Sequence, residues 1–398
     1  MLTRLLNKRQ LVVLGLNSGT SADALDLAAV RIRRAGPKTT ARFLTGGTRR
    51  FPSELRHLAL EAADATSIQP ERLVILHNLL GEFFGREAAR YIRKLASEGL
   101  KVDLAASHGQ TVRHLPERAR IAGFTVNGSL QLGSLERIAA RTGRVTVGDF
   151  RQADIALGHE GAPITVTAMA RLFARPQESQ LIVNIGGMSN YFYFPAARSG
   201  QRIRAADCGP GNSLLDILSK KLYGEEFDRY GRHALSGDVS QRLLSLLLAE
   251  PFFSGKAAST GREAFGDRLA TRILGLGAKL KLLPEDLMAT TAELTVAAVV
   301  QSIERLVARD RSLTKLCLTG GGLKNRFLTR RLTEIFEDLE VGSVGELGVP
   351  PDLVEAAAYA VMGEACLRSE SLPAVFGRSG EQKRQPVPGA IAQPPQGV

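Results

Sequence analysis

Short apolar runs that end in glycine-containing turns mark the first half of the chain. Leu11–Leu16 predicts a buried strand that leads into a Gly/Ser/Thr turn, and Ala24–Ile32 and Ala41–Phe51 are strand-like. Two helices are expected next, at Ser53–Ala63 and Gln69–Glu98, the second with apolar residues at helical spacing. The remaining elements of this half are strands at Val102–Ala106 and Val145–Gly148 and a helix at Ile164–Ala174.

The same order of elements begins again at Leu181. Leu181–Gly187 predicts a strand that enters a glycine turn, and strands at Tyr191–Phe194 and Arg202–Ala206 and a helix at Asn212–Tyr223 follow it. The last predicted elements are a strand at Lys315–Thr319 and helices at Lys324–Phe336 and Asp352–Arg368. The repeated order predicts a duplicated α/β chain. Coincidence is the alternative, because the halves share element order and not residue identity.

Composition places the chain among globular α/β proteins. Its 398 residues suit two domains or one large unit, and 44% of them are hydrophobic. The longest apolar runs fall well short of the roughly 18–20 residues that span a bilayer. The N-terminus carries no export signal, and the three cysteines form no CxxC pair. We therefore expect a cytoplasmic protein that does not enter a membrane.

The formal net charge of +12 raises the question of nucleic-acid binding. Arg accounts for 40 of the 52 basic residues, they are spread along the whole chain, and there is no Trp. Nucleic-acid proteins concentrate basic residues in patches interleaved with aromatic ones. A solvated basic surface that attracts an anionic substrate is the favoured interpretation.

Three glycine turns follow predicted strands, and they point to a phosphate ligand. They are Asn17–Asp26, Asn184–Asn190 and Thr319–Asn325. Glycine lets backbone N–H groups approach a phosphate closely, and Ser and Thr hydroxyls add donors. None of the turns matches the GxxxxGK[ST] or GxGxxG pattern. One such turn is ordinarily only a tight turn, but three in a duplicated chain favour a nucleotide held between two lobes.

Acidic residues near these turns have the chemistry that phosphoryl transfer needs. Asp23 and Asp26 lie just past the first turn, where they would orient a hydrated metal ion. Asp207 ends a predicted strand before a rigid Gly-Pro-Gly-Asn turn. A general base at the mouth of a cleft is one interpretation of Asp207. For any single Asp, a helix cap or turn-stabilising residue is the alternative.

Two further motifs carry polar side chains at strand ends. His108-Gly-Gln110-Thr provides hydrogen bonds for a polyol, with an ordinary loop histidine as the alternative, and no metal-spaced His or Cys accompanies it. Asp149-Phe-Arg151-Gln-Ala-Asp154 places two acids around an arginine. That motif indicates either an ion pair or a contact to a sugar or phosphate.

The chain resembles the anhydro-N-acetylmuramic acid kinase family, within the actin/Hsp70/sugar-kinase fold group. The resemblance runs from about Gly15 to Gly377, and the order and spacing of the motifs match the family's. The stretches that carry it are Ser18–Asp26, Ser107–Thr111, Gln131–Gly133, Gly148–Arg151, Asp154–Gly158, Gly161–Pro163, Asn184–Gly187, Asp207–Asn212, Ser259–Glu263, Glu293–Thr295, Gly320–Gly322, Asn325 and Glu355.

This resemblance implies a two-lobed α/β protein of the actin-like ATPase, ribonuclease H-like fold. Duplicated mixed-sheet domains would enclose a central nucleotide cleft. We expect an N-terminal lobe at residues 1–155 with the first phosphate loop and the sugar contacts. A C-terminal lobe at 156–370 would carry the second phosphate loop, the catalytic Asp and the adenosine loop, and a partly disordered segment would follow at 371–398.

The resemblance also assigns roles to individual residues. Asp207 matches the family's catalytic base. Residues that match nucleotide-binding segments are Gly19, Thr20, Ser21, Ala22, Asp23, Ala24, Leu25 and Asp26, then Gly186 and Gly187, and on the adenosine side Gly320, Gly321, Gly322 and Asn325. Residues expected to bind the sugar are His108, Gln110, Arg151, Asp154 and Glu355. No residue is expected to bind metal directly; Mg²⁺ would come with ATP, with Asp23 and Asp26 acting through water.

Family members open the 1,6-anhydro bridge of anhydro-N-acetylmuramic acid with water and phosphorylate O6. The product is N-acetylmuramic acid 6-phosphate, an intermediate of cell-wall recycling. The expected protein is therefore an ATP- and Mg²⁺-dependent kinase of a small sugar, with a homodimer as a possible assembly. The alternatives are a kinase for another anhydro sugar such as levoglucosan, and a catalytically silent sugar- or nucleotide-binding relative.

Several motif positions depart from the family pattern. Asn17 replaces the Met that precedes Ser-Gly-Thr-Ser, and Ala24 replaces a Gly. The other departures are Leu115, Ser134, Gln152, Ala153, His159, Glu160, Ala258 and the segment Phe376-Gly-Arg378. Asp23, Asp26 and Asp207 are kept. We therefore predict that the departures alter substrate preference and leave the chemistry in place.

Overall fold

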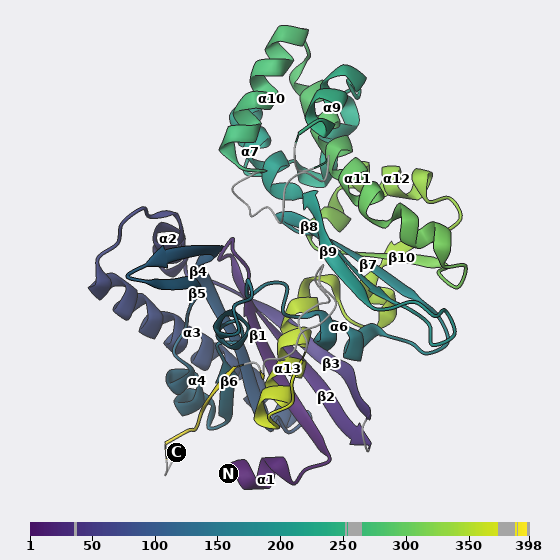
Figure 1. Cartoon of the computed structure of the whole chain (residues 1–398). Coiled ribbons are helices and arrows are strands. Elements are labelled where there is room, and N and C mark those ends of the chain that lie inside the picture. The colour runs from purple at the N-terminus through teal and green to yellow at the C-terminus, as the bar shows by residue number, and fades with distance from the viewer. Residues whose placement is uncertain (36–37, 251–252, 254–264, 373–386, 388, 396–398) are drawn as a thin grey trace. The chain divides into compact units, whose positions relative to one another are not determined.

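The computed structural model describes residues 1–35, 38–250, 253, 265–372, 387 and 389–395, and these divide into two compact units. Unit 1 consists of Met1–Leu172 together with Leu353–Val398, and unit 2 of Phe173–Asp352. Within the described residues, no helix is long and apolar enough to cross a membrane. Figure 1 shows the elements of both units.

Unit 1 is built on a mixed sheet in the order β12-β6-β4-β1-β2-β3, with β5 paired to β4. Strand β1 is antiparallel to β2 and parallel to β4, β2 is antiparallel to β3, and β4 is parallel to β6. The strands are β1 (Gln10–Ser18), β2 (Ala24–Ala35), β3 (Lys38–Arg50), β4 (Leu104–Ile121), β5 (Phe124–Leu132), β6 (Val145–Gly148) and β12 (Ala390–Ala392). The helices are α1 (Leu2–Leu6), α2 (Ser53–Asp64), α3 (Pro70–Ser97), α4 (Leu135–Thr142), α5 (Gln152–Ala156), α6 (Val166–Phe173) and α13 (Val354–Leu367).

Helices cover both faces of β1, which explains why every residue of this strand except Gln10 is buried. Alternate residues of a strand point to opposite faces. Leu14 and Leu16 pack into a core with Phe84 of α3, whereas Gly15 faces α13. A Cβ added at Gly15 would lie 1.8 Å from the Ala356 carbonyl oxygen. The glycine therefore allows α13 to pack directly on the strand.

Unit 2 has a five-stranded sheet, among the described residues, in the order β11-β10-β7-β8-β9. Strand β7 is antiparallel to β8 and parallel to β10, β8 is antiparallel to β9, and β10 is parallel to β11. The strands are β7 (Gln180–Ile185), β8 (Met188–Phe194), β9 (Arg204–Pro210), β10 (Lys315–Thr319) and β11 (Glu340–Ser343). The α-helices are α7 (Asn212–Tyr223), α8 (Arg232–Ser236), α9 (Gln241–Leu248), α10 (Asp267–Leu280), α11 (Pro284–Arg309) and α12 (Arg326–Ile335), and short 3₁₀ turns lie at Arg229–Gly231, Gly321–Lys324, Val344–Leu347 and Pro351–Leu353.

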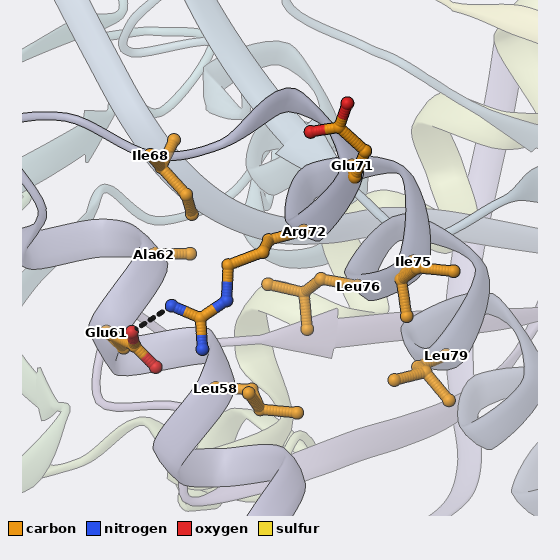
Figure 2. A pocket seen from close by; sticks show the side chains of 9 residues that line it. All are labelled: Leu58, Glu61, Ala62, Ile68, Glu71, Arg72, Ile75, Leu76 and Leu79. Atoms are coloured by element: carbon orange, nitrogen blue, oxygen red, sulfur yellow. Dashed lines mark hydrogen bonds and ion pairs between the residues drawn. The ribbon is translucent and has the colours of Figure 1, made fainter.

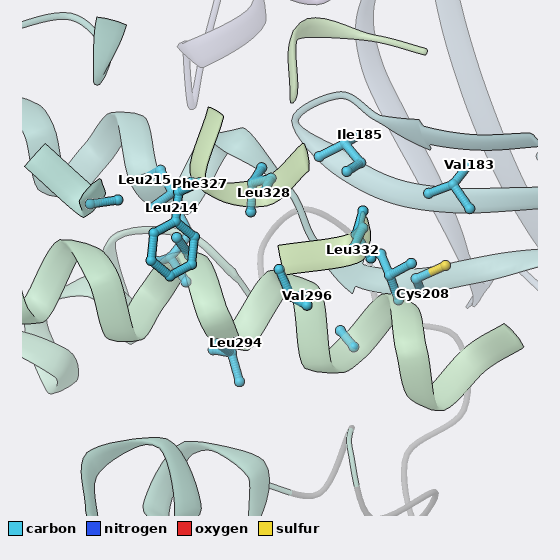
Figure 3. Close-up of a cluster of buried hydrophobic side chains, with 14 of the residues drawn as sticks. Val183, Ile185, Cys208, Leu214, Leu215, Leu294, Val296, Phe327, Leu328 and Leu332 are labelled. Carbon is cyan, nitrogen blue, oxygen red and sulfur yellow. The ribbon is translucent and has the colours of Figure 1, made fainter. Parts of the chain in front are cut away.

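The core of unit 2 forms between its sheet and helices α7, α11 and α12. Val183 and Ile185 of β7 are fully buried and belong to one apolar cluster with Leu214, Leu294 and Leu328. Figure 3 shows part of this cluster around α11. The cluster holds the start of α7 against the end of β7, next to two of the glycine turns.

The duplication predicted from element order is confirmed by the strand pairing. In unit 1, β3-β2-β1-β4-β6 has the same order and the same strand directions as β9-β8-β7-β10-β11 in unit 2. Three antiparallel strands followed by two parallel ones form the ribonuclease H-like arrangement, here present twice. The chain therefore has the duplicated α/β fold expected of the actin-like group.

The division of the chain differs from the expected lobes at two points. The first segment of unit 1 extends to Leu172, and the chain returns to unit 1 at Leu353. The last long helix, α13, was expected in the C-terminal lobe, but it packs on β1 and β4 of unit 1. Its small residues fit the close approach, since a Cβ added at Gly363 would lie 2.5 Å from the Ala106 Cβ.

The C-terminal segment and one motif can be described only in part. Ala390–Ala392 forms a strand that pairs with β6 in antiparallel register, where a partly disordered tail was expected. The motif at Ser259–Glu263, the departure at Ala258 and the segment Phe376–Arg378 lie outside the described residues.

Candidate active site

The carboxyl ends of the parallel strands β1, β4 and β6 bring together polar residues from three distant segments of unit 1. Leu16 pairs with Ser107, Ser18 with Gln110, and Ser107 with Gly148. Loops at the carboxyl ends of parallel strands are the usual place for ligand sites in α/β sheets. The motifs at residues 17–26, 107–111 and 148–154, each of which follows a strand, therefore meet at one edge of the sheet.

A β-bulge lies at the centre of this edge. Between the pairs Leu16–Ser107 and Ser18–Gln110, β1 contributes Asn17 whereas β4 contributes both His108 and Gly109. Gly109 has φ +76°, and a Cβ there would lie 2.8 Å from the Leu132 carbonyl oxygen. Bulges re-aim side chains and are common beside active sites. The sequence predicted that the strand would end before His108, whereas β4 continues through the bulge into a hairpin with β5.

Gln110 holds the first glycine turn in place. The Ser18 hydroxyl donates to its Oε1 at 2.5 Å, and its Nε2 donates to the Gly19 carbonyl at 3.1 Å. The Gln110 side chain is almost fully buried. Both the oxygen and the nitrogen of its amide thus form hydrogen bonds within the protein. The structural role of Gln110 is therefore to fix the first glycine turn.

His108 is buried between an aromatic ring and a guanidinium. Its imidazole stacks on the Tyr359 ring with centroids 4.5 Å apart, and Arg151 Nε donates to its Nε2 at 3.2 Å. A guanidinium can only donate, so this ring nitrogen must be an unprotonated acceptor. Burial first, and then the Arg151 charge, hold the pKa of His108 well below its ordinary value of 6.5. The histidine is therefore neutral at physiological pH.

Two acids of the Asp149–Asp154 motif occupy different environments. Asp154 is buried; its carboxylate accepts from the Gly161 N–H at 2.9 Å and lies 3.0 Å from His159 Nδ1, so it organises the loop at 158–161. Asp149 has φ +57°, a left-handed conformation that costs a non-glycine residue about 1–3 kcal/mol. Partial burial raises the pKa of the Asp149 carboxyl. Arg151 donates to the Gly161 carbonyl at 2.7 Å, which ties the motif to the same loop.

The residues of the first turn lie partly at the surface and partly in the core. Gly19, Thr20, Ser21 and Asp23 are exposed, whereas Ala22 and Leu25 are fully buried. Asp23 forms an ion pair with Arg56 at 2.7 Å, and Asp26 on β2 accepts from the Thr48 hydroxyl at 2.6 Å. Ala24, at the start of β2, pairs with Arg50 of β3. Among the described residues, no group of three or more Asp, Glu, His or Cys side chains is arranged to hold a metal ion.

Glu355 joins this edge from the first turn of α13. Its Oε2 accepts from Asn17 Nδ2 at 2.8 Å, although 338 positions separate the two residues in the chain. Tyr359 lies one helical turn further along α13, on the same face as Glu355, and stacks on His108. Glu355 is thus the exposed end of a cluster within unit 1 in which Tyr359 and His108 are buried and Arg151 bonds to the histidine.

In unit 2, the second and third glycine turns lie side by side. They follow β7 and β10, which are adjacent parallel strands with Asn184 opposite Thr319. Gly320 has φ +80°, and a Cβ there would lie 2.5 Å from Asn184 Oδ1. Asn212, the first residue of α7, donates to the Ile185 carbonyl at 3.1 Å. Gly186, Gly187 and Gly320–Gly322 are therefore brought together, as the sequence predicted for one ligand.

Asp207 lies near the end of β9, just before the chain turns into α7. It is exposed and pairs in register with Asn190 of β8. The turn that follows is fixed by the second glycine turn, because Asn212 N–H donates to the Gly186 carbonyl at 2.8 Å and Gly211 N–H to the Gly187 carbonyl at 3.0 Å. This arrangement places an exposed carboxylate beside a glycine turn and a helix N-terminus.

A cavity of about 440 Å³ opens beside the third glycine turn, wholly within unit 2. Gly321 and Asn325, two predicted nucleotide residues, contribute to its wall. The side chain of Asn325 caps α12 by accepting from the Phe327 N–H at 3.0 Å, so it shapes the wall. The remaining lining residues are Asn212, Leu215, Asp216, Phe227, Asp228, Arg229, Tyr230 and Lys324.

The two aromatic residues of this cavity, Phe227 and Tyr230, are not among the site residues predicted from the sequence. Phe227 and Tyr230 are 52% and 57% exposed, which is unusual for large aromatic side chains. The Arg229 guanidinium lies over the Phe227 ring and the Arg326 guanidinium over the Tyr230 ring. Both aromatic residues belong to the segment Glu225–Gly231, where each aromatic residue follows two charged ones. This clustering was the signal available in the sequence, and it lies outside the glycine turns on which the prediction relied.

A second cavity, of about 210 Å³, lies between α2 and α3 of unit 1 (Figure 2). Its lining is mainly apolar, including Leu58, Ile68 and Leu76, and Arg72 forms an ion pair with Glu61 at its side. None of the predicted site residues lines this cavity. It is therefore separate from the candidate site.

Comparison with known proteins gives a consistent family. The family model for anhydro-N-acetylmuramic acid kinase matches residues 11–394. An anhydro-N-acetylmuramic acid kinase of Salinibacter ruber is 36% identical over 370 residues, which cover 92% of this chain and 93% of the relative. One of Coxiella burnetii is 34% identical over 381 residues, covering 95% and 96%. Among solved structures, the activator of a 2-hydroxyisocaproyl-CoA dehydratase from Clostridium difficile shares 13% identity at a TM-score of 0.41, covering 90% of this chain and 96% of that one, a likeness too distant to carry a conclusion.

Proposed function

The chain belongs to the anhydro-N-acetylmuramic acid kinase family, and on that premise we propose that it hydrolyses and phosphorylates anhydro-N-acetylmuramic acid at the expense of ATP. The observation that carries this proposal is the match of the family model over residues 11–394, nearly the whole chain. The relatives' names favour the muramic sugar over levoglucosan and favour an active kinase over a silent relative.

The proposed reaction consumes one molecule each of water, the anhydro sugar and ATP. Water adds to the anomeric carbon C1 while the bond from C1 to the bridging O6 breaks. The proton leaves the attacking water for a carboxylate base, and O6 forms its new bond to the γ-phosphorus of ATP, which releases ADP. The products are N-acetylmuramic acid 6-phosphate and ADP, which places the enzyme in cell-wall recycling.

Asp207 is the proposed base. Its exposure makes the carboxylate accessible to a water molecule and a sugar, and the fixed turn at Gly211–Asn212 limits movement of the strand end. A general base must lie within hydrogen-bond reach of the proton that it removes, so a rigid mount is an advantage. In unit 1, His108, Arg151 and Glu355 are the proposed sugar contacts. Gln110 and Asp154 are proposed to support the loops around them, because their side chains are already bonded within the protein.

The nucleotide is proposed to bind unit 2 through the cavity beside Gly321. A volume of about 440 Å³ lies within the range of roughly 300–1,000 Å³ that is typical of small-molecule pockets. Phe227 and Tyr230 offer rings for stacking on adenine, and Gly186, Gly187 and Gly320–Gly322 leave backbone accessible for phosphates. The first turn, at Gly19–Asp26, is proposed as the second source of phosphate contacts.

Mg²⁺ is the proposed companion of ATP, where it would neutralise phosphate charge. Asp23 and Asp26 are proposed to hold it through water, since both carboxylates already have protein partners in Arg56 and Thr48. The proposed location is the cytoplasm. The proposed partners are the sugar and ATP, without nucleic acid or membrane, and a second copy of the chain is the proposed protein partner.

A coupled assay of ADP release tests this function. We expect ADP to form with anhydro-N-acetylmuramic acid and to form more slowly with levoglucosan. The hydrolysed form of either sugar should not be the preferred substrate. Reaction in ¹⁸O-labelled water should place the label at C1 of the phosphorylated product. Absence of sugar-dependent ADP release, or an unlabelled product, would overturn the proposal.

A further inference from the structure

Asn17 is the one residue of the first glycine motif that differs from the family pattern and also contacts a proposed sugar residue. It lies next to the end of β1, is 5% exposed, and stands opposite the bulge at His108–Gly109. Its Nδ2 donates to Glu355 Oε2 at 2.8 Å. The family's usual methionine at this position has no hydrogen-bond donor on its side chain.

The backbones on both sides of this hydrogen bond are held rigidly. Gly15 packs so closely on the Ala356 carbonyl that β1 and the start of α13 keep a fixed spacing. Asn17 is two residues after Gly15, and Glu355 is next to Ala356. With both backbones fixed, one side-chain hydrogen bond is enough to select the rotamer of the glutamate.

The hydrogen bond from Asn17 leaves the second carboxylate oxygen of Glu355, Oε1, for a ligand. Among the residues that the structure describes, Asn17 is the hydrogen-bond partner of Glu355, and it uses only Oε2. Glu355 itself is exposed. Behind it lie the stacked rings of Tyr359 and His108, which are 4% and 5% exposed, with Arg151 bonded to the histidine. The remaining oxygen, Oε1, is available to accept a hydrogen bond from a sugar hydroxyl group.

We propose that Asn17 is a positioning residue that orients the Glu355 carboxylate toward the sugar. The inference rests on the proposed function, since it takes the sugar as the ligand of Glu355. Asn17 does not touch the reacting atoms; it acts through Glu355. An exposed glutamate without such a partner samples several rotamers, and the sugar must then order it at the cost of binding free energy.

The test is a set of steady-state measurements on Asn17→Met, which installs the family's usual residue. We expect the KM for anhydro-N-acetylmuramic acid to rise about tenfold, the scale of one hydrogen bond to a charged group, while kcat and the KM for ATP stay unchanged. If Asn17 had only a structural role, Asn17→Met would lower the midpoint of thermal unfolding or raise the KM for both the sugar and ATP. Asn78→Met is the matched control, since Asn78 on α3 is half-buried and makes side-chain hydrogen bonds, to the Val74 carbonyl and from Arg137 Nε, that involve none of the proposed site residues.

Two further variants complete the test. Asn17→Asp keeps the side-chain shape but sets a carboxylate against Glu355, so the sugar KM should rise more than in Asn17→Met. In a Glu355→Ala background, Asn17→Met should have no additional effect on the sugar KM. If Asn17→Met fails to fold, Asn17→Asp carries the test. An unchanged sugar KM in the folded variants, or additive effects with Glu355→Ala, overturns the inference. Lack of sugar phosphorylation by the wild-type enzyme overturns the proposed function instead.

Discussion

The two units share one sheet arrangement but use its carboxyl edge in opposite ways. In unit 1 the edge is filled by polar side chains that bond to one another, and Asn17, His108, Gln110 and Asp154 are each at least about nine-tenths buried. In unit 2 the corresponding edge consists of glycine turns, an exposed Asp207 and a cavity of about 440 Å³. Duplication of the fold has therefore not duplicated the chemistry.

The difference indicates that the two units have different binding functions. Internally bonded side chains hold a fixed geometry, and this suits recognition of a rigid bicyclic sugar. Glycine turns and an open cavity leave backbone N–H groups and aromatic rings accessible, and this suits a nucleotide. The comparison predicts that changes at Asp207 and at the cavity of unit 2 affect turnover and ATP use, whereas changes in the buried polar cluster of unit 1 around His108 affect the sugar and the pH dependence of stability.

The largest expected effect is on turnover, from Asp207→Asn in unit 2. The amide keeps the shape of the carboxylate but cannot accept a proton from water, so kcat should fall at least about a hundredfold. ATP affinity, measured by calorimetry, should stay within error of the wild type. Asp338→Asn, an exposed acid of the same unit, is the control and should keep full activity. Retention of more than about a tenth of the activity by Asp207→Asn would remove this residue from the role of base.

The next effect concerns the cavity that is proposed to hold the nucleotide. Tyr230→Ala removes one exposed ring, and stacking of a base on an aromatic side chain is worth about 1–3 kcal/mol. The KM for ATP should therefore rise about tenfold while the sugar KM stays constant. Phe124→Ala serves as the control, because Phe124 is an exposed aromatic residue of unit 1. An equal rise in both KM values for Tyr230→Ala would contradict the assignment of the cavity to the nucleotide.

A third effect separates glycines that the fold requires from those that it tolerates. Gly320→Ala combines φ +80° with a Cβ that would lie 2.7 Å from the Ile185 carbonyl oxygen, so unfolding in urea should show a loss of about 1–3 kcal/mol. Gly275→Ala is the matched control in α10, where an added Cβ meets no described atom within 4 Å. It should stabilise the helix by about 0.5–1 kcal/mol. Equal effects of the two substitutions would contradict the close packing of the β10 turn.

The smallest effect is a dependence of stability on pH that arises in unit 1. Burial and Arg151 hold the pKa of His108 well below 6.5, so below pH 6.5 the unfolded chain binds more protons than the folded one. The contribution of His108 to the free energy of unfolding is therefore complete above about pH 6.5. It falls as the pH drops, by at most about 1.4 kcal/mol per pH unit. His108→Gln should reduce the fall in the unfolding midpoint between pH 7.5 and 5.5.

His57→Gln is the control for this slope, because His57 is exposed on α2. Burial also lowers the pKa of His114, so some of the slope should remain in His108→Gln. A slope in His108→Gln as steep as in the wild type would show that His108 is not buried in its neutral form.

Local patterns predicted many elements well but could not predict their partners. The boundaries of α7, β6 and β10 match the prediction residue for residue. The hairpin of β4 and β5 was missed because Pro116 and several arginines interrupt the strand pattern. The predicted assignment of α13 to the C-terminal lobe was wrong. The alanine-rich sequence of α13 can pack against any closely approaching surface, and the sequence alone does not show that Gly15 of β1 provides that surface.

The candidate site shows the same limit. The sequence placed each motif after a predicted strand, and the pairing of β1 with β4 and of β7 with β10 brings these segments together at two strand edges. Whether a polar side chain faces a ligand or its own loop depends on contacts that spacing does not encode. Gln110 and Asp154 illustrate this, since both were expected to bind the sugar and both are buried with protein partners.

The interrupted path of unit 1 has a consequence for how the chain reaches its native state on the ribosome. Unit 2 is a continuous segment, so all of its strands have been synthesised before α13 is complete. Unit 1 must wait, because the face of β1 around Gly15 packs on α13, which lies more than 330 residues later in the chain. Domains generally fold as units during synthesis, and closure of long loops slows folding. The segment that is translated first is thus the last to be completed, and its sheet stays open on one side until nearly the whole protein has been made.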